Sequence, residues 1–197
     1  MKVGNAIKER RSAKKFLKKK VSMQDLCSVA DASRYAPMAG NIYSIRVVAV
    51  EDEKKKGDIA KCCAEQYFIQ DAPYLLVVFS DPTRVRQMFK GMAKKYLRQQ
   101  AGAAIQNMLL KATELELQSC WIGAFDDGVI KRVLRVPENI EVEAVIAIGY
   151  GRQERMPFKQ SPDYCFFWNS YGKWQRHGGM EGVRDTAIAV RETEGER

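Results

Sequence analysis

Apolar residues recur along this chain in two spacings, and each spacing predicts one kind of secondary structure. The runs at residues 46–50 and 74–80 are near-continuously apolar and bounded by turn-forming residues, which predicts strands covered on both faces. Two further short strands are predicted at 119–122 and 142–148. Helical spacing predicts helices over residues 3–11, 22–33, 59–69, 99–117 and 127–134. Strands that alternate with helices indicate a sheet with both faces covered.

The helix over residues 99–117 has the clearest pattern. Five apolar residues share one stripe, which we expect to face the core: Ile105, Met108, Leu109, Ala112 and Leu115. Ser22 opens another helix, and Asp25 three residues later completes a capping-box-like pair. In the N-terminal helix, Ile7 is expected to face inward.

The length of 197 residues suits one compact domain, and the composition predicts neither disorder nor repeats. We expect this domain to span residues 1–177, because the composition then shifts to Gly, Glu and Arg and predicts a mobile tail over 178–197. No apolar run approaches the roughly 20 residues that cross a bilayer. The basic N-terminus also lacks the apolar segment of a secretion signal. We therefore expect a cytoplasmic protein without a membrane partner.

Six large aromatic residues near the C-terminus predict a partner surface. They are Tyr164, Phe166, Phe167, Trp168, Tyr171 and Trp174. Exposed together, they would form an apolar patch larger than a soluble monomer usually tolerates. They therefore need a partner surface to pack on.

Few residues in this chain suit catalysis without a cofactor. The five cysteines form no C-x-x-C pair, which argues against a disulfide framework and a zinc site. The one histidine, His177, lies in a Gly-rich stretch. We therefore expect no metal site and no Ser-His-Asp or Cys-His nucleophile set. An enzyme built from this chain is expected to use an organic cofactor.

The residues from Arg10 to Lys20 form a basic segment, because seven of these eleven residues are Lys or Arg, in a chain of net charge +9. Three interpretations remain open at this point: a solvated surface, a phosphate site and a nucleic-acid patch. The chain has neither a G-x-G-x-x-G nor a Walker A sequence, so side chains would have to hold a phosphate.

Six elements, in order along the chain, resemble the signature of the nitroreductase family. They are AIKERRSAKKF at 6–16, APMAGN at 36–41, Gln66 with Asp-Ala-Pro at 71–73, AIQNMLL at 104–110, SCWIGAF at 119–125 and IGYG at 148–151. Each element alone is a weak signal. Together, in sequence and at sensible intervals, they indicate an FMN-dependent oxidoreductase.

The resemblance implies that the basic segment holds the FMN phosphate. Arg10, Arg11 and Ser12 would contact the phosphate and the ribityl chain through charge-assisted hydrogen bonds. Lys14 would approach the N1/O2 edge of the flavin ring, where a cation stabilises the negative charge of the reduced form.

The partner subunit would supply part of each flavin site. Pro37 and Asn41 would line the ring from that subunit, with Met38 in the same element. Family members often have Ser where this chain has Met38, so one hydroxyl ligand is lost. Where Gln-Pro-Trp often follows the Asn, this chain has Tyr-Ser-Ile at 43–45, which changes the residues expected to border the substrate.

Other elements would complete the site. Gln66 would hydrogen-bond the pyrimidine edge, and Lys159, with Arg152 as an alternative, would be a late basic ligand of the phosphate. The residues expected to approach the ring face, with room left by the glycine, are Trp121, Ile122 and Gly123.

The fold that this resemblance implies is one α+β domain, in which helices flank a mixed, mostly antiparallel sheet, paired into a homodimer with an exchanged C-terminal segment. NAD(P)H would reduce the flavin and leave before a nitroaromatic, quinone or similar small acceptor binds, in a ping-pong cycle. No side chain is assigned as a general acid. Two alternatives remain open: a flavin-binding protein without turnover, for storage or sensing, and a nucleic-acid binder that uses the basic segment but lacks a supporting fold motif.

Overall fold

The computed structural model describes residues 1–152, 155–160, 167 and 169–172 of the chain. The chain divides into two units, Met1–Glu154 and Arg155–Arg197. All helices and strands of the described residues belong to the first unit. The predicted boundary at residue 177, the predicted tail and most of the predicted aromatic segment lie outside the described residues.

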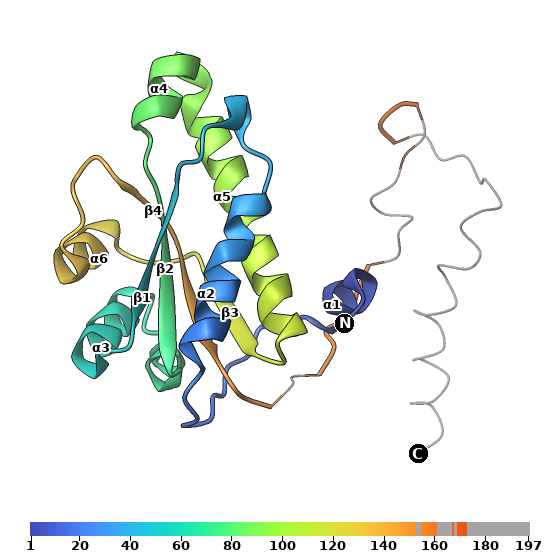
Figure 1. Ribbon diagram of the computed structural model, residues 1–197, viewed down its shortest axis with the longest axis vertical. Helices are drawn as coiled ribbons and strands as arrows, with labels where there is room; N and C mark the ends of the chain where they lie inside the picture. Colours follow the sequence, from blue (N-terminus) through green and yellow to red (C-terminus); the bar gives the residue numbers. More distant parts are fainter. Residues whose placement is uncertain (153–154, 161–166, 168, 173–197) are drawn as a thin grey trace. The chain divides into compact units, whose positions relative to one another are not determined.

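A four-stranded sheet forms the centre of the first unit (Figure 1). Its strands are β1 (Ile45–Val50), β2 (Tyr74–Ser80), β3 (Gln118–Ile122) and β4 (Glu141–Gly149). They lie in the order β1-β2-β4-β3, and every pairing between them is antiparallel. The predicted antiparallel sheet is therefore confirmed, with β2 and β4 at its two central positions.

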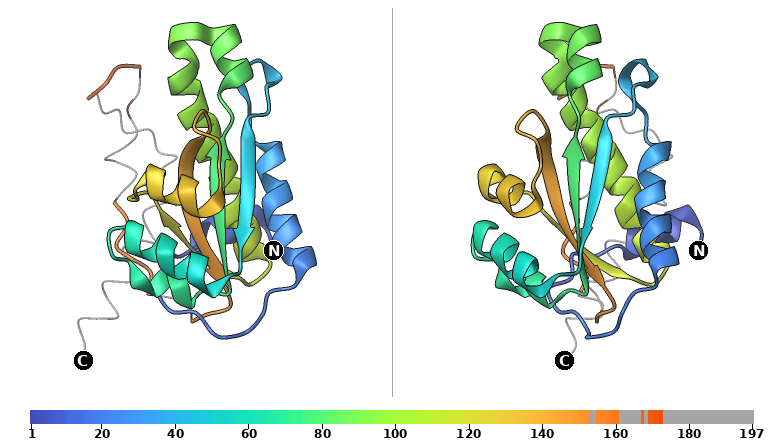
Figure 2. Two further views of the ribbon diagram at one scale, coloured as in Figure 1. Left: turned by 90° about the vertical axis from the view of Figure 1, so that its left-hand side faces the viewer. Right: turned by 60° about the vertical axis from the view of Figure 1, so that its left-hand side comes forward.

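Helices cover both faces of this sheet (Figure 1, Figure 2). One face carries α2 (Met23–Ala32) and α5 (Ala93–Glu114), and the other carries α3 (Glu53–Cys62) and α6 (Asp127–Leu134). Both α1 (Val3–Glu9) and α4 (Thr83–Phe89) contact α5. The short 3-10 helices of the described residues are η1 (Ser33–Tyr35), η2 (Ala39–Asn41), η3 (Tyr67–Asp71) and η4 (Lys90–Met92).

Strand β2 contributes to two hydrophobic cores, because successive side chains of a strand point to opposite faces of the sheet. The β2 residues in the core shared with α2 and α5 are Tyr74, Leu76 and Val78. Those in the core shared with α3 and α6 are Leu75, Val77 and Phe79. All residues of β2 are buried, which confirms the predicted strand covered on both faces.

Side-chain caps set the start of three helices. Ser22 Oγ accepts a hydrogen bond from the Asp25 N–H at 3.0 Å, which confirms the predicted capping pair. Asp52 caps α3 and Asp126 caps α6 in the same way. The stripe of α5 predicted to face the core is buried apart from its last residue, Leu115, which is partly buried.

Several expectations about local structure were wrong. The predicted helix over 59–69 begins earlier and stops short, because Ala64 and Glu65 adopt positive φ angles of 51° and 56°. Ile7 is 57% exposed, and the buried residue of α1 is Ala6. Strand β1 lies at the edge of the sheet with several exposed side chains, so it is not covered on both faces. Helix α4 was not predicted.

A network of charges ties α4 and α5 to strand β4. Arg98 of α5 pairs with Glu143 at 2.5 Å and with Glu141 at 3.4 Å, and Arg86 of α4 pairs with Glu141 at 2.7 Å. The Glu143 side chain is only 3% exposed. Burial raises the pKa of Glu143, and the nearby Ser80 hydroxyl and Arg98 guanidinium offset only part of this rise.

Replacing Arg98 by Met should lower the free energy of unfolding by about 2 kcal/mol near neutral pH, because the buried Glu143 carboxylate loses its cation while Arg98 itself is half-exposed. Since the pKa of Glu143 is raised on folding, the folded state takes up a proton more readily than the unfolded chain. The loss should therefore shrink as the pH falls through the raised pKa. Urea unfolding over a pH series measures this effect. Glu143→Gln added to Arg98→Met should restore most of the loss, and a loss that neither changes with pH nor is restored would contradict the account.

Candidate functional site

The basic N-terminal segment is fixed beside strand β3. Ser12 forms a parallel bridge with Ser119, and the Ala13 N–H donates to the Ser119 carbonyl at 3.0 Å. Farther along, Phe16 forms an antiparallel bridge with Gly151, just after β4. The segment thus extends an otherwise antiparallel sheet with a parallel bridge.

The backbone of this segment turns its cations away from the core. Ala13 is fully buried, whereas Ser12 and Lys14 are exposed and Arg10 is half-buried. Burial raises the pKa of the Cys120 thiol in β3, and the charges of Lys14 and Arg10 lower it in part. Both cations therefore lie within electrostatic reach of β3, one residue before Trp121.

The end of β3 presents an exposed aromatic side chain beside open space. Trp121 is 39% exposed, whereas its neighbour Ile122 is buried. A Cβ added to Gly123 would meet only Trp121 Nε1, at 4.0 Å. This edge of the sheet therefore offers an apolar face that a planar ring could approach.

Gln66 belongs to a turn that is joined to the loop after β3. Its Nε2 donates to the Cys63 carbonyl at 3.0 Å. The Asp126 N–H, in the loop after β3, donates to the Cys62 carbonyl at 3.0 Å. The structure thus brings the turn that carries Gln66 to the chain segment that follows Gly123.

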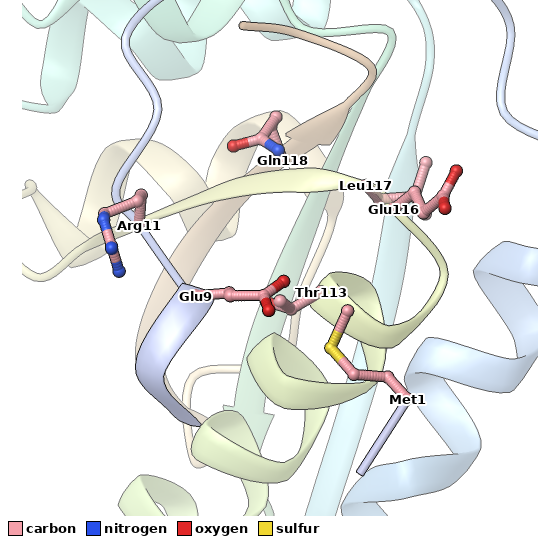
Figure 3. A pocket seen from close by; sticks show the side chains of 7 residues that line it. All are labelled: Met1, Glu9, Arg11, Thr113, Glu116, Leu117 and Gln118. Atoms are coloured by element: carbon pink, nitrogen blue, oxygen red, sulfur yellow. The ribbon is translucent and has the colours of Figure 1, made fainter. Parts of the chain in front are cut away.

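A pocket of about 190 Å³ lies at the start of the basic segment (Figure 3). Its lining residues come from the N-terminus, the end of α5 and the start of β3: Met1, Glu9, Arg11, Thr113, Glu116, Leu117 and Gln118. The carboxylates of Glu9 and Glu116 share this pocket with the Arg11 guanidinium, so the pocket is not purely cationic. Arg10, Ser12 and Lys14 do not line it.

The Arg11 guanidinium has a buried donor, Nε, that is not used in a hydrogen bond within the described residues. Its Nη1 donates to the carbonyls of Lys8 at 2.5 Å and of Arg10 at 2.9 Å. Its Nε is buried and has no hydrogen-bond partner among the described residues. A buried, unpaired donor costs free energy, so a bound acceptor at this atom would be stabilising.

The predicted element at 36–41 lies at the opposite end of the sheet from the basic segment (Figure 1). Pro37 and Asn41 are exposed, and Met38 is half-buried. In one chain, these residues do not meet the basic segment.

The strand register gives the separation between the two elements. Ile45, which follows the 36–41 element, pairs with Ser80 at one end of β2. Ser119, which is bonded to the basic segment, pairs with Ile148, and Ile148 pairs with Tyr74 at the other end of β2. Because a strand rises about 3.3 Å per residue, these ends lie roughly 20 Å apart. One chain therefore does not bring the two predicted groups of site residues together.

The two candidates for a late phosphate ligand belong to different units of the chain. Arg152 is exposed in the first unit, and Lys159 is exposed in the second. Their role stays a prediction.

Sequence reasoning missed two features that shape this region. Gln100 is 3% exposed and bonds the chain around the 36–41 element, and a polar residue beside the apolar stripe of α5 was the available signal. Gly149 and Gly151 permit close packing: an added Cβ would lie 2.4 Å from Pro73 Cδ and 2.5 Å from the Lys15 carbonyl oxygen, respectively.

Comparisons with known proteins agree with this geometry. A protein of Archaeoglobus fulgidus whose name pairs NADH dehydrogenase with NAD(P)H nitroreductase is 26% identical over 150 residues, which cover 74% of this chain and 83% of the relative. An iodotyrosine deiodinase of Thermotoga neapolitana is 25% identical, with 73% of this chain and 85% of the relative covered. The crystal structure of an FMN-dependent nitroreductase from Clostridium difficile superposes with a TM-score of 0.72 at 26% identity and covers 84% of this chain and 98% of that chain.

The antiparallel sheet flanked by helices, with the basic segment beside β3, is the architecture of an α+β protein, and the family match below assigns it to the oxidoreductase class. Residues 7–81 and 60–150 match the Nitroreductase family, so the chain belongs to that family and is an oxidoreductase of the NAD(P)H nitroreductase type. This confirms the predicted resemblance.

In the described part of the chain, no helix is both long and apolar enough to span a membrane. The same residues hold no group of three or more His, Cys, Asp or Glu side chains arranged for a metal ion.

Replacing Gly151 by Ala should lower the free energy of unfolding by about 2 kcal/mol, because the added Cβ would meet the Lys15 backbone and force the basic segment from the sheet. Gly102→Ala, in helix α5, is the control: no atom lies within 4 Å of its added Cβ, and alanine favours a helix by up to about 1 kcal/mol. Chemical unfolding of both variants measures the difference. Equal stability of the two variants would show that the close contact is not needed.

Proposed function

We propose that this chain is an FMN-dependent oxidoreductase that uses NAD(P)H to reduce a small acceptor such as a nitroaromatic or a quinone. The observation that carries the proposal is the pairing of the basic segment with strand β3, which ends at the exposed Trp121 and the open Gly123. The relative from Clostridium difficile, an FMN-dependent nitroreductase, supports this cofactor.

The donors of the basic segment fit a phosphate-bearing ring cofactor. Arg10 and Ser12 offer a guanidinium and a hydroxyl for a phosphate, and the unpaired Arg11 Nε adds a buried donor. Lys14 is exposed two residues after Ser12, whose backbone is bridged to β3, and would offer its positive charge to the ring edge. A monophosphate suits this set better than a dinucleotide, since the chain has no glycine-rich dinucleotide fingerprint.

FMN, when bound, would supply the redox chemistry: hydride uptake from NAD(P)H, followed by reduction of the acceptor. The chain's own residues would bind FMN and adjust the charge around its ring. Lys14 stabilises negative charge at the pyrimidine edge, and Gln66 hydrogen-bonds that edge. Trp121, Ile122 and Gly123 hold the ring face, and the open space at Gly123 admits donor and acceptor in turn. Lys159 is proposed as a further ligand of the phosphate.

The proposal includes a homodimer, because one chain holds the two halves of the site roughly 20 Å apart. Pro37 and Asn41 are exposed, as residues that complete a partner's site must be. Met38 packs partly against the core and fixes the loop from within. We propose a single domain of residues 1–177 whose C-terminal segment exchanges between subunits. Most of that segment lies outside the described residues.

The purified protein should be yellow with FMN, and changing Arg10 and Lys14 together to Ala should weaken FMN binding by at least about 100-fold, the loss expected for two charge-assisted hydrogen bonds. Flavin fluorescence titration of the apoprotein measures the dissociation constants. Changing Lys54 and Lys55 of α3 to Ala is the control, since these exposed lysines carry the same charge elsewhere. If the Arg10 and Lys14 variant retains full FMN occupancy, these residues do not form the site.

Steady-state kinetics with NAD(P)H and a quinone should give parallel double-reciprocal lines, because donor and acceptor would use the same open face in turn. Anaerobic addition of NAD(P)H alone should bleach the visible absorption band of the flavin, which also separates an enzyme from a flavin store. Intersecting lines would show that both reactants bind together and would exclude the shared face.

A further inference from the structure

We propose that Gln100 is a positioning residue: it holds the loop of residues 36–44 in the conformation that presents Pro37 and Asn41 to the flavin of the partner subunit. The inference rests on the proposed function and assigns a role to a residue outside the six elements that carry the family resemblance.

Three hydrogen bonds connect the Gln100 amide to this loop. Its Oε1 accepts from the Ala39 N–H at 3.2 Å, and its Nε2 donates to Ser44 Oγ at 3.0 Å and to the Ile42 carbonyl at 3.4 Å. One buried side chain is therefore hydrogen-bonded to the loop on both sides of Asn41. By comparison, the amides of Gln66 and Asn107 each donate to one backbone carbonyl, those of Cys63 and Ala32.

The backbone between these anchor points is strained. Gly40 and Asn41 are consecutive residues in the left-handed region, with φ angles of 57° and 54°. Such a conformation costs free energy for a residue with a side chain and persists only where neighbours determine it. Gly40 also leaves no room beneath the turn, since an added Cβ would lie 2.9 Å from Met88 Sδ and 3.0 Å from the Phe89 ring. Packing thus closes one side of the turn, and Gln100 bonds its two ends.

The support behind Gln100 is rigid. It lies in α5, a helix of 22 residues, between the buried Leu97 and Ala104. Arg98, two residues earlier, ties the same helix to Glu143 of the central strand β4. The position of the loop is therefore set by the sheet.

Gln100 is 3% exposed and satisfies polar groups of the loop, including the buried Ser44 hydroxyl, that an apolar side chain of similar size would leave unpaired. What an apolar side chain could not do is fix the Ala39 N–H and the Ile42 carbonyl in defined directions. The polar residue therefore specifies one loop conformation.

Gln100→Met keeps the volume and removes all three bonds. Asn107→Met is the matched control, because Asn107 lies on the same helix and its amide donates to one backbone carbonyl, that of Ala32 at 3.4 Å. Gln100→Met should raise the FMN dissociation constant by about tenfold and alter the visible flavin spectrum. Asn107→Met should do neither. Ser44→Ala, which removes one anchor, should act in the same direction as Gln100→Met with a smaller effect and serves if that variant folds poorly.

A mixed dimer tests whether the loop acts on the partner. One subunit carries Arg10→Ala and Lys14→Ala, and the other carries Gln100→Met. If the loop of each subunit serves the other's flavin, both defects fall in one site and the second site is intact, so half of the sites should bind FMN with the affinity of the unaltered protein. If the loop serves its own subunit, no site should keep that affinity.

The outcomes separate the two proposals. An unaltered protein that binds FMN, with a Gln100→Met variant that matches Asn107→Met in affinity and spectrum, overturns the role of Gln100 and leaves the proposed function intact. An unaltered protein that binds no FMN overturns both. A mixed dimer without any intact site overturns the action on the partner subunit.

Discussion

Strands β2 and β4 are buried on both faces, and the rest of the molecule is arranged around that constraint. A backbone in such a layer must satisfy its hydrogen bonds within the sheet, because no water reaches it. Alternate side chains of β2 enter two different cores, so each face requires its own pair of helices. Helices therefore cover both faces of the sheet, so the candidate functional residues lie at the edge formed by β3 and in the loops at the strand ends.

This placement explains why the candidate site is divided. The cationic segment joins the sheet beside β3, and the 36–44 loop enters β1 at the far end. Neither location is free to move, since one is set by backbone pairing and the other by Gln100. In the proposed homodimer, a second copy of the chain brings the two halves together, and two-fold pairing generates two equivalent sites from one surface.

The sequence predicted best what depends on neighbouring residues alone. The cap at Ser22, the buried strand β2 and the stripe of α5 are local patterns, and all are confirmed. The start of α3 was predicted too late in the chain, because its first turns consist of polar residues that give no apolar pattern. One of them, Lys56, is nevertheless 2% exposed and donates to the Ala72 carbonyl at 2.8 Å. The prediction that Ile7 is buried was wrong, because the spacing of apolar residues does not reveal which side of α1 contacts α5.

The family resemblance gave Arg10, Lys14 and Trp121 as ligands of one flavin, with Asn41 supplied by the partner subunit. The strand register adds that, within one chain, the element with Asn41 and the basic segment lie at opposite ends of the sheet. That division follows from long-range pairing, which no local pattern encodes. Gln100 was missed for the same reason, because its partners lie far from it in the chain.

The bridges from Ser12 to Ser119 and from Phe16 to Gly151 have a consequence for the order of folding during synthesis. The basic segment leaves the ribosome before every strand of the sheet, yet its pairing partners lie in β3 and just after β4. Until these partners emerge, a run of unpaired positive charge remains exposed on the nascent chain. A segment made before all the strands is therefore among the last parts of the described fold to reach its native position.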